Sequence, residues 1–551
     1  MVQLVQNFET EEKAFIAANI LTPNYDIEKV KLQTQKTPRW IHFGGGNLYR
    51  AFHTAIADTL LNLQAAETGI ILIETYDEEI IEKVYTPFHN RNLQVVMNAD
   101  GTLEKRLLAG TVLSATTLGK DAQQLMELSN YFTSEYLQVV TCCITEKGYN
   151  LWESTGKILP NVQQDIENGP AAILNHTMSQ VTRFLVSRYT IGNAAPLALV
   201  STDNFSQNGK HFQKSILTIA KGWVAKGFVE SGFINYLTDD KKVTFPWSMI
   251  DRITPNPAPA VAERLLKDGF EDIALITTKK GTNLAAFANT EQICYLVIED
   301  AFPNGRPEFE KAGVFLADRD TVEKVEEMKV TTCLNPLHTS LAIFGCLLGY
   351  QSISSEMEDK NLVALIKQIG YIEGLPVVTD PVIINPQAFI DEVVKERLPN
   401  PYIPDTPQRI ATDTSQKMRV RFGETIKKYL KSDNLDIQNL YCIPLTIAGW
   451  FRYLLGIDDA GKPFTPSPDP LLEQLQAQMK LITFGKNDNV AAVLNPILKN
   501  TRIFGVDLCE VGLAEKIVKM FIELNQGTGA IKTTIEKYVN NHLSTKKEEL
   551  K

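Results

Sequence analysis

The chain of 551 residues lacks several features that mark specialised classes of protein. It has no run of 18 apolar residues, so the sequence predicts no transmembrane helix. The N-terminus has neither a basic start nor a long apolar segment, which is not the pattern of a secretory signal. Internal repeats and low-complexity tracts are also missing. The sequence therefore predicts a packed globular protein.

Cysteine is sparse, with seven in the chain, and none forms a C-x-x-C pair. This usage favours reduced, buried thiols and a cytoplasmic location over a disulfide framework. No Cys and His residues cluster with the spacing of metal ligands, so no metal is expected. A catalytic thiol stays open as an alternative.

Basic residues are fewer than acidic ones. Lys plus Arg number 55 and Asp plus Glu number 65, which gives a net charge of −10. This balance argues against nucleic acid as a partner and, on average, against anionic ligands. We expect a small-molecule substrate and neither nucleic acid nor membrane as a partner.

The first informative pattern lies between residues 40 and 77. A short strand at 40–43 leads into Gly44-Gly45-Gly46-Asn47, a helical period over 48–63, and a second strand at 70–73. This order is typical of dinucleotide-binding βαβ units, in which glycines let the backbone approach a pyrophosphate. The third glycine of the usual fingerprint is absent, so a tight turn without a ligand is the alternative.

Two acids follow the second strand. Glu74 or Asp77 could bind a ribose hydroxyl, which favours NAD(H) over NADP(H). The alternative is a pair of solvated acids at a strand end.

Further strands and helices set the expected domain organisation. Strands at 137–144 and 197–201 flank a helix at 178–189, which indicates a mainly parallel sheet with helices on both faces. From residue 316 onward helical segments dominate. We therefore predict an α/β domain over 1–305, with 1–38 as an N-terminal extension, and a mostly α-helical domain over 306–551.

Seven segments, in order, resemble the long-chain mannitol dehydrogenase family of polyol and uronate oxidoreductases. They are IHFGGGNLYRAF (41–52), TEKGY (145–149), STDNF (201–205), FPWSMIDRITP (245–255), IEDAFPNGRP (298–307), LNPLHTSLA (334–342) and AGWFRYLLGID (448–458). The resemblance implies a Rossmann-type N-terminal domain, a helical C-terminal domain, and metal-independent use of NAD(H) or NADP(H).

Within the family, ATDTSQKMRVRFGETI (411–426) is most similar to the fructuronate reductases. That similarity implies reduction of D-fructuronate to D-mannonate with NADH. Tagaturonate reduction and mannitol 2-dehydrogenation are the enzymatic alternatives. A catalytically silent dinucleotide sensor is the non-enzymatic one.

The resemblance also implies which residues act. The implied catalytic residues are Lys329 as acid–base group, Asn204 and Asn335 as oxyanion ligands, and His338, which orients the substrate or the lysine. The implied cofactor-binding residues are Gly44, Gly45, Gly46, Asn47, Glu74, Thr145 and Glu146, and Asp251 is an acid near the substrate.

The spacing of the catalytic lysine departs from the family. Five residues separate Lys329 from Asn335, where four are usual. On a continuous α-helix the extra residue would rotate Lys329 by about 100°. We predict that 330–332 is extended, so that a bulge absorbs the insertion, and that Asn335 and Pro336 are the N-cap and first residue of a helix. The alternatives are a capping Asn335, a solvated Lys329 and a structural His338.

A uronate carries a carboxylate, which cationic side chains bind. Arg397 and Lys417 are the candidate ligands, and Arg397 and Asn400 resemble the family's R-x-x-N-P segment. Asp405 stands where family members often carry a basic residue. For Arg419 and Arg421, a basic helix face in water is at least as good an interpretation.

Overall fold

The computed structural model describes residues 1–118 and 122–549, with side chains up to residue 540. The chain divides into two compact units. The first comprises Met1–Asn98 and Thr102–Glu323, and the second comprises Ala99–Gly101 and Lys324–Lys551. The first unit thus extends past the boundary predicted after residue 305.

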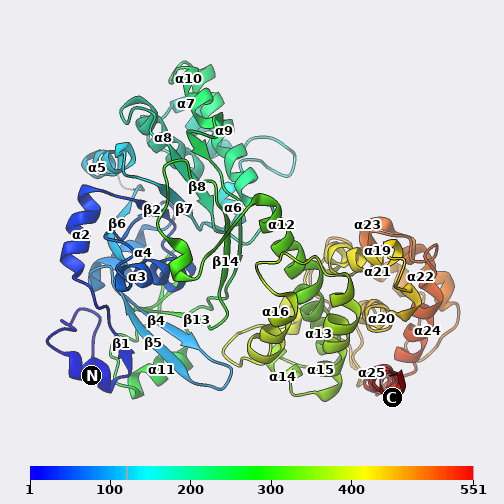
Figure 1. The fold of residues 1–551 in the computed structure, drawn as a ribbon. Helices are drawn as coiled ribbons and strands as arrows, with labels where there is room; N and C mark the ends of the chain where they lie inside the picture. Colours follow the sequence, from blue (N-terminus) through cyan, green and yellow to red (C-terminus); the bar gives the residue numbers. More distant parts are fainter. Residues whose placement is uncertain (119–121, 550–551) are drawn as a thin grey trace. The chain divides into compact units, whose positions relative to one another are not determined.

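A parallel sheet organises the first unit. Its strands, in spatial order, are β6 (Thr111–Thr116), β3 (Ile70–Glu74), β2 (Trp40–Phe43), β7 (Val139–Cys142), β8 (Leu197–Ser201) and β9 (Val243–Thr244). Every neighbouring pair runs parallel. The predicted parallel sheet is therefore confirmed, and Figure 1 shows it in the first unit.

Both faces of this sheet are covered, as the strand sequences require. Ile41 and Phe43 point into a core built with residues of α8 and α9, whereas Trp40 points into a core built with α3. The helical segments of this unit are α1 (Glu12–Ala17), α2 (Ile27–Lys36), η1 (Tyr49–His53), α3 (Thr54–Asn62), α4 (Glu78–Ile80), η2 (Ile81–Tyr85), η3 (Thr86–Phe88), α5 (Ala122–Thr133), α6 (Thr145–Tyr149), α7 (Pro160–Asn168), α8 (Thr177–Thr190), α9 (Asn208–Ala225), α10 (Gly232–Thr238), α11 (Pro259–Lys267) and η4 (Phe309–Ala312).

Three smaller sheets in the first unit were not predicted. One orders β1 (Ile20–Leu21), β5 (Leu103–Leu108), β4 (Asn92–Met97) and β13 (Phe287–Glu291). A second orders β10 (Ser248–Asp251), β14 (Tyr295–Glu299) and β15 (Phe315–Ala317), and a third pairs β11 (Ile276–Thr277) with β12 (Asn283–Leu284).

The second unit is helical in the part that the structure describes, as predicted. Its segments follow α12 (Arg319–Met328) and are η5 (Lys329–Cys333), α13 (Asn335–Leu348), α14 (Ile353–Glu356), α15 (Lys360–Lys367), η6 (Gln368–Gly374), η7 (Leu375–Val377), α16 (Pro386–Glu392), η8 (Val393–Arg397), α17 (Pro407–Ile410), α18 (Thr414–Met418), η9 (Arg419–Gly423), α19 (Glu424–Lys431), η10 (Ile437–Asn439), α20 (Cys442–Leu454), α21 (Leu472–Met479), α22 (Val490–Leu498), α23 (Thr501–Phe504), α24 (Ala514–Leu524) and α25 (Ala530–Glu549).

In the described residues, one helix has a length and composition that a membrane span could also have, which was not predicted. By length and composition alone, Arg319–Leu348 is long and apolar enough to cross a bilayer. However, 83% of its most apolar window is buried inside the protein. Core helices pass the same test, so the match is weak support for a membrane span.

Candidate active site

The glycine turn follows β2 directly, and its first glycine is needed for backbone reasons. Gly44 has a φ of +102°, and a Cβ at this position would collide with the carbonyl oxygen of Cys143. At Gly46, in contrast, a Cβ would meet nothing within 4 Å. The turn therefore leaves open space beside Gly46, where a ligand could approach the protein backbone closely. Asn47 donates from Nδ2 to the carbonyl of Asn283, at 3.0 Å.

Glu74 ties the turn to the end of β3. One carboxylate oxygen accepts from the Gly45 amide at 2.7 Å, and the other accepts from the amides of Thr75, Tyr76 and Asp77 at 2.8–3.2 Å. Burial raises the pKa of this carboxyl, while these amide donors act to lower it. Glu74 is thus engaged by backbone before any ligand binds, and its ribose contact stays a prediction.

The solvated-acid interpretation is wrong for both acids. Glu74 and Asp77 are buried. Asp77 accepts from the hydroxyls of Thr278 and Thr282 at 2.6 and 2.8 Å. It therefore fastens the segment before β12 to the end of β3.

Asp203 connects the ends of β7 and β8 through hydrogen bonds, as Glu74 connects the turn to the end of β3. The sequence did not predict this role. Its carboxylate accepts from the amides of Ile144 and Thr145 at 2.8 and 2.9 Å, from the Tyr149 hydroxyl at 2.8 Å, and from the Cys143 thiol at 3.7 Å. Burial raises its pKa. An acid at the end of a buried strand, beside the quoted Asn204, was the available signal.

The other predicted residues of the first unit follow β7 and β8 or lie in a second sheet. Thr145 begins α6 with a φ of +65°, and Glu146 follows it on the surface. Asn204 is exposed in the loop after β8. Asp251 is buried at the end of β10, opposite Tyr295 in the strand register. Their roles remain predictions.

In the second unit, Lys329 opens a π-helical turn. The Leu334 amide donates to the Lys329 carbonyl, five residues back, at 3.1 Å. A π-turn holds one more residue than an α-turn, so the insertion is absorbed within the helix. The prediction that 330–332 is extended is therefore wrong, but a bulge does accommodate the extra residue. Lys329 is only 3% exposed, so it is not a solvated surface lysine.

Asn335 does not cap its helix. It is the first residue of α13, Pro336 is the second, and Leu334 holds the cap position without a side-chain hydrogen bond. The His338 amide donates to the Leu334 carbonyl at 3.0 Å, not to the Asn335 side chain. The predicted N-cap is wrong, and in the described part of the chain the Asn335 amide group makes no hydrogen bond.

His338 is half-buried, and its imidazole is neutral at physiological pH. Burial and the charges of Arg421, Arg409, Arg397 and Lys417 lower its pKa to about 3. Its Nε2 lies 3.4 Å from the Asp405 carboxylate, but the geometry is not that of a hydrogen bond. A neutral imidazole at this distance is not an ion pair, so the surrounding cations dominate its environment.

The four cations that act on His338 define a basic cluster: Arg397, Arg409, Lys417 and Arg421. Arg397 is buried and ends π-turn η8, three residues before Asn400, which is also buried. Lys417 lies in α18, two residues before π-turn η9. Arg397 and Lys417, which are predicted to bind the substrate carboxylate, thus both act electrostatically on His338.

The solvated-face interpretation holds for Arg419 and is wrong for Arg421. Arg419 is exposed, whereas Arg421 is half-buried and donates to the Thr339 hydroxyl. Burial lowers the pKa of Arg421 to about 10. No local sequence signal separates the two arginines, because the contact joins residues 82 positions apart.

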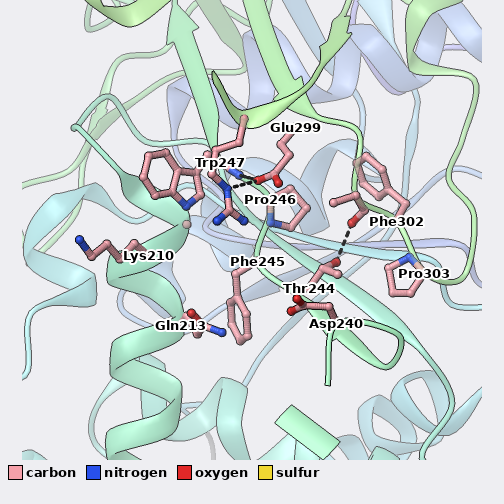
Figure 2. A pocket seen from close by; sticks show the side chains of 13 residues that line it. Lys210, Gln213, Asp240, Thr244, Phe245, Pro246, Trp247, Glu299, Phe302 and Pro303 are labelled. Atoms are coloured by element: carbon pink, nitrogen blue, oxygen red, sulfur yellow. Dashed lines mark hydrogen bonds and ion pairs between the residues drawn. The ribbon is translucent and has the colours of Figure 1, made fainter. Parts of the chain in front are cut away.

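A separate cavity of about 710 Å³ lies in the first unit (Figure 2). It is lined by Gly209, Lys210, Gln213, Asp240, Thr244, Phe245, Pro246, Trp247, Glu299, Ala301, Phe302, Pro303 and Arg319. Glu299 accepts from the Trp247 amide at 3.0 Å and pairs with Arg319 at 3.1 Å. None of the predicted site residues lines this cavity. Its charges are already paired in part and of both signs, so they define no ligand.

Two further observations concern cysteine and metal chemistry. All seven cysteines are free, and burial raises the pKa of Cys142 and Cys143, which disfavours a reactive thiolate at either position. Among the described residues, no group of three His, Cys, Asp or Glu side chains is placed to hold a metal ion.

A glycine turn on a parallel sheet, together with a helical unit that carries a buried lysine and a half-buried asparagine and histidine, is the arrangement of a dinucleotide-dependent oxidoreductase. Comparisons with known proteins specify the family. The Mannitol dehydrogenase Rossmann domain matches residues 38–311, and the Mannitol dehydrogenase C-terminal domain matches residues 321–524. The chain belongs to the mannitol dehydrogenase family, and it is an oxidoreductase that acts on CH–OH groups.

Individual relatives agree with this assignment. A D-mannonate oxidoreductase of Thermotoga maritima is 48% identical over 533 residues, which cover 96% of this chain and 97% of the relative. A solved D-sorbitol dehydrogenase shares the fold with a TM-score of 0.77 and 24% identity, covering 94% of this chain and 98% of that one. The mannitol 2-dehydrogenase of Pseudomonas fluorescens, solved with NAD and D-mannitol, has a TM-score of 0.66, 23% identity, and coverages of 95% and 97%. The predicted family and fold class are confirmed.

Proposed function

We propose that the protein interconverts D-fructuronate and D-mannonate with NAD(H) as its cofactor. The observation that carries this proposal is the basic cluster, which concentrates four cations around a neutral histidine in a chain whose net charge is −10. Such a cluster suits a sugar acid better than an uncharged polyol. The D-mannonate oxidoreductase relative, at 48% identity, supports the same substrate pair.

The glycine turn fits a dinucleotide. Gly44 lets the chain leave β2, and the open space at Gly46 admits a pyrophosphate against the backbone. Glu74 braces the turn through the Gly45 amide. NAD(H), when bound, supplies or accepts the hydride. We assign Gly44, Gly45, Gly46, Asn47, Glu74, Thr145 and Glu146 to its binding.

The residues of the chain handle the proton and the developing charge. We assign Lys329 as the group that donates a proton to the carbonyl oxygen during reduction and takes it back during oxidation. The amides of Asn335 and Asn204 donate hydrogen bonds to that oxygen. His338, held neutral, orients the substrate, and we assign Asp251 as an acid near the substrate.

Substrate recognition falls to Arg397, Asn400 and Lys417. Burial and the charges of Arg421 and Arg409 lower the pKa of Lys417 to about 8, while Asp413 and Asp469 act to raise it, so the ammonium group is mostly protonated at neutral pH. The substrate is a small sugar acid, and the seven free cysteines support a cytoplasmic location.

The test is NADH oxidation with D-fructuronate, D-tagaturonate and D-fructose in parallel. We expect the highest kcat/KM with D-fructuronate. A higher value with D-fructose overturns the uronate assignment, and a higher value with D-tagaturonate transfers it to the epimer. NADH binding without turnover of any of the three supports a dinucleotide sensor instead.

A further inference from the structure

The members of the basic cluster differ in how their charge is balanced. Arg409 pairs with the carboxylate of Asp405, the acid that also faces His338. Lys417 donates only to backbone, to the carbonyls of Ile410 and Thr412. In the described residues neither Lys417 nor Arg421 makes an ion pair.

The charges of Asp413 and Asp469 act on Lys417, whereas burial alone accounts for the lowered pKa of Arg421. One of its terminal nitrogens donates to the Thr339 hydroxyl, and within the described chain its other guanidinium nitrogens make no hydrogen bond. A half-buried guanidinium without a carboxylate is costly to keep charged. Even with the lowering caused by burial, its pKa of about 10 leaves it cationic at neutral pH. The site therefore holds a positive charge that an anion would stabilise.

The position of Arg421 relates this charge to the assigned chemistry. Thr339, which holds the guanidinium, is the residue after His338 on α13. Arg421 is also the cation that contributes most to lowering the pKa of His338, after burial itself. The guanidinium is thus fixed beside the histidine assigned to orient the substrate.

We propose that Arg421 binds the carboxylate of the sugar acid and thereby determines the preference for hexuronates over uncharged ketoses. The proposal rests on the proposed function and adds a residue to it. A guanidinium presents paired donors that match the two oxygens of a carboxylate, which an ammonium group such as that of Lys417 does not. The bond to Thr339 sets the plane of that fork before the substrate arrives.

The first experiment compares Arg421→Gln with the wild type on D-fructuronate and D-fructose, with NADH. Loss of a charged hydrogen-bonding partner should raise KM for D-fructuronate by about 30- to 100-fold. KM for D-fructose, which has no carboxylate, should change by less than about twofold. Arg421→Lys, which keeps the charge but not the fork, should fall between the two. It also serves as the test variant if Arg421→Gln does not fold.

Arg419→Gln is the matched control, because Arg419 lies on the same π-turn but is exposed. It should leave both KM values unchanged. An unchanged KM for D-fructuronate in Arg421→Gln overturns the proposal. So does an equal rise for both substrates, since that would indicate a general structural role.

A binding measurement separates this inference from the proposed function. Calorimetry on the NAD-loaded protein should show that D-mannonate binds more tightly than D-mannitol, and that Arg421→Gln removes the difference. If the wild type does not reduce D-fructuronate but this preference and its loss are still observed, the proposed reaction fails and the role of Arg421 stands. If Arg421→Gln retains the preference, the role of Arg421 fails whatever the reaction.

Discussion

Charged side chains are paired differently at the glycine turn and in the basic cluster. Beside the glycine turn, Glu74 and Asp203 each accept four hydrogen bonds from their own chain. In the basic cluster, neither Lys417 nor Arg421 makes an ion pair in the described residues, although the charges of Asp413 and Asp469 act on Lys417. At the turn that we propose binds the cofactor, the two acids are thus paired by hydrogen bonds within the chain, whereas Arg421, in the cluster that we propose binds the substrate, has no carboxylate partner among the described residues. The proposed function therefore predicts that charge matters more for binding the substrate than for binding the cofactor.

The largest effect should come from Lys329, the proposed acid–base residue. Lys329→Ala should lower kcat by about 10²- to 10⁴-fold at neutral pH, because general acid–base catalysis contributes this much. Steady-state kinetics with NADH and D-fructuronate measure it. The control is Lys395→Ala, an exposed lysine of the same unit, which should keep normal turnover. Turnover close to wild type in Lys329→Ala would remove its assigned role.

The substitution Glu74→Gln tests whether the hydrogen bonds of this carboxylate stabilise the glycine turn. In Glu74→Gln an amide NH₂ faces backbone donors that now lack an acceptor, and each such buried donor costs about 1–3 kcal/mol. We expect a lower Tm and a KM for NADH raised by about tenfold, with binding of D-mannonate unaffected. Glu78→Gln, an exposed acid on the same segment, should change neither quantity. An unchanged Tm in Glu74→Gln would mean that the carboxylate does not brace the turn.

The contribution of the Lys417 charge to substrate binding can be tested through the pH dependence of KM. Its pKa of about 8 means that its positive charge is lost as the pH rises through that value. In the wild type, KM for D-fructuronate should therefore rise severalfold between pH 7 and pH 9. Lys417→Met should start from a higher KM at pH 7 and show no such rise. The same pH dependence in both proteins would show that another group titrates.

The smallest effect concerns Glu356, a carboxyl that is buried without the hydrogen bonds that Glu74 and Asp203 receive. Glu356 is buried against α13, yet both its oxygens lack hydrogen-bond partners, and burial raises its pKa well above the usual value. The folded state then binds a proton that the unfolded state has lost, so its contribution to stability falls as the pH rises above about 4.5.

Glu356→Gln should remove this dependence. Above neutral pH the variant should unfold a few degrees higher than the wild type, and at pH 5 the two should nearly coincide. Calorimetric Tm values across this range measure the difference. Glu358→Gln, an exposed neighbour, should follow the wild type at every pH. A variant that unfolds lower than the wild type at pH 8 would contradict the prediction.

Much of the fold could be predicted because hydrophobic periodicity carries it. The strand at 197–201 and the helix at 178–189 follow directly from runs and spacings of apolar residues. The smaller sheets escaped, because strands such as β4 and β13 pair across nearly 200 residues of chain and no local pattern records that. The π-turns escaped because their apolar period is too close to that of an α-helix.

In the candidate site too, features set by the local sequence could be predicted and features set by distant residues could not. Gly44 was predictable, since its position between a strand and a helix demands unusual backbone angles. Whether an acid or a cation is buried was not, because burial depends on partners distant in the sequence. Asp77 binds threonines some 200 positions away, and Arg421 binds Thr339. Composition alone left these residues indistinguishable from solvated ones.

The π-turn at Lys329 has a consequence for how such proteins are recognised. A helix that takes in one residue through a wider turn keeps the residues on either side on their original faces, so an insertion there can survive selection. The number of residues between a catalytic lysine and its asparagine is then not a fixed signature. A search pattern that demands one spacing would reject this chain, although the π-turn that begins at Lys329 accommodates the extra residue before α13 begins.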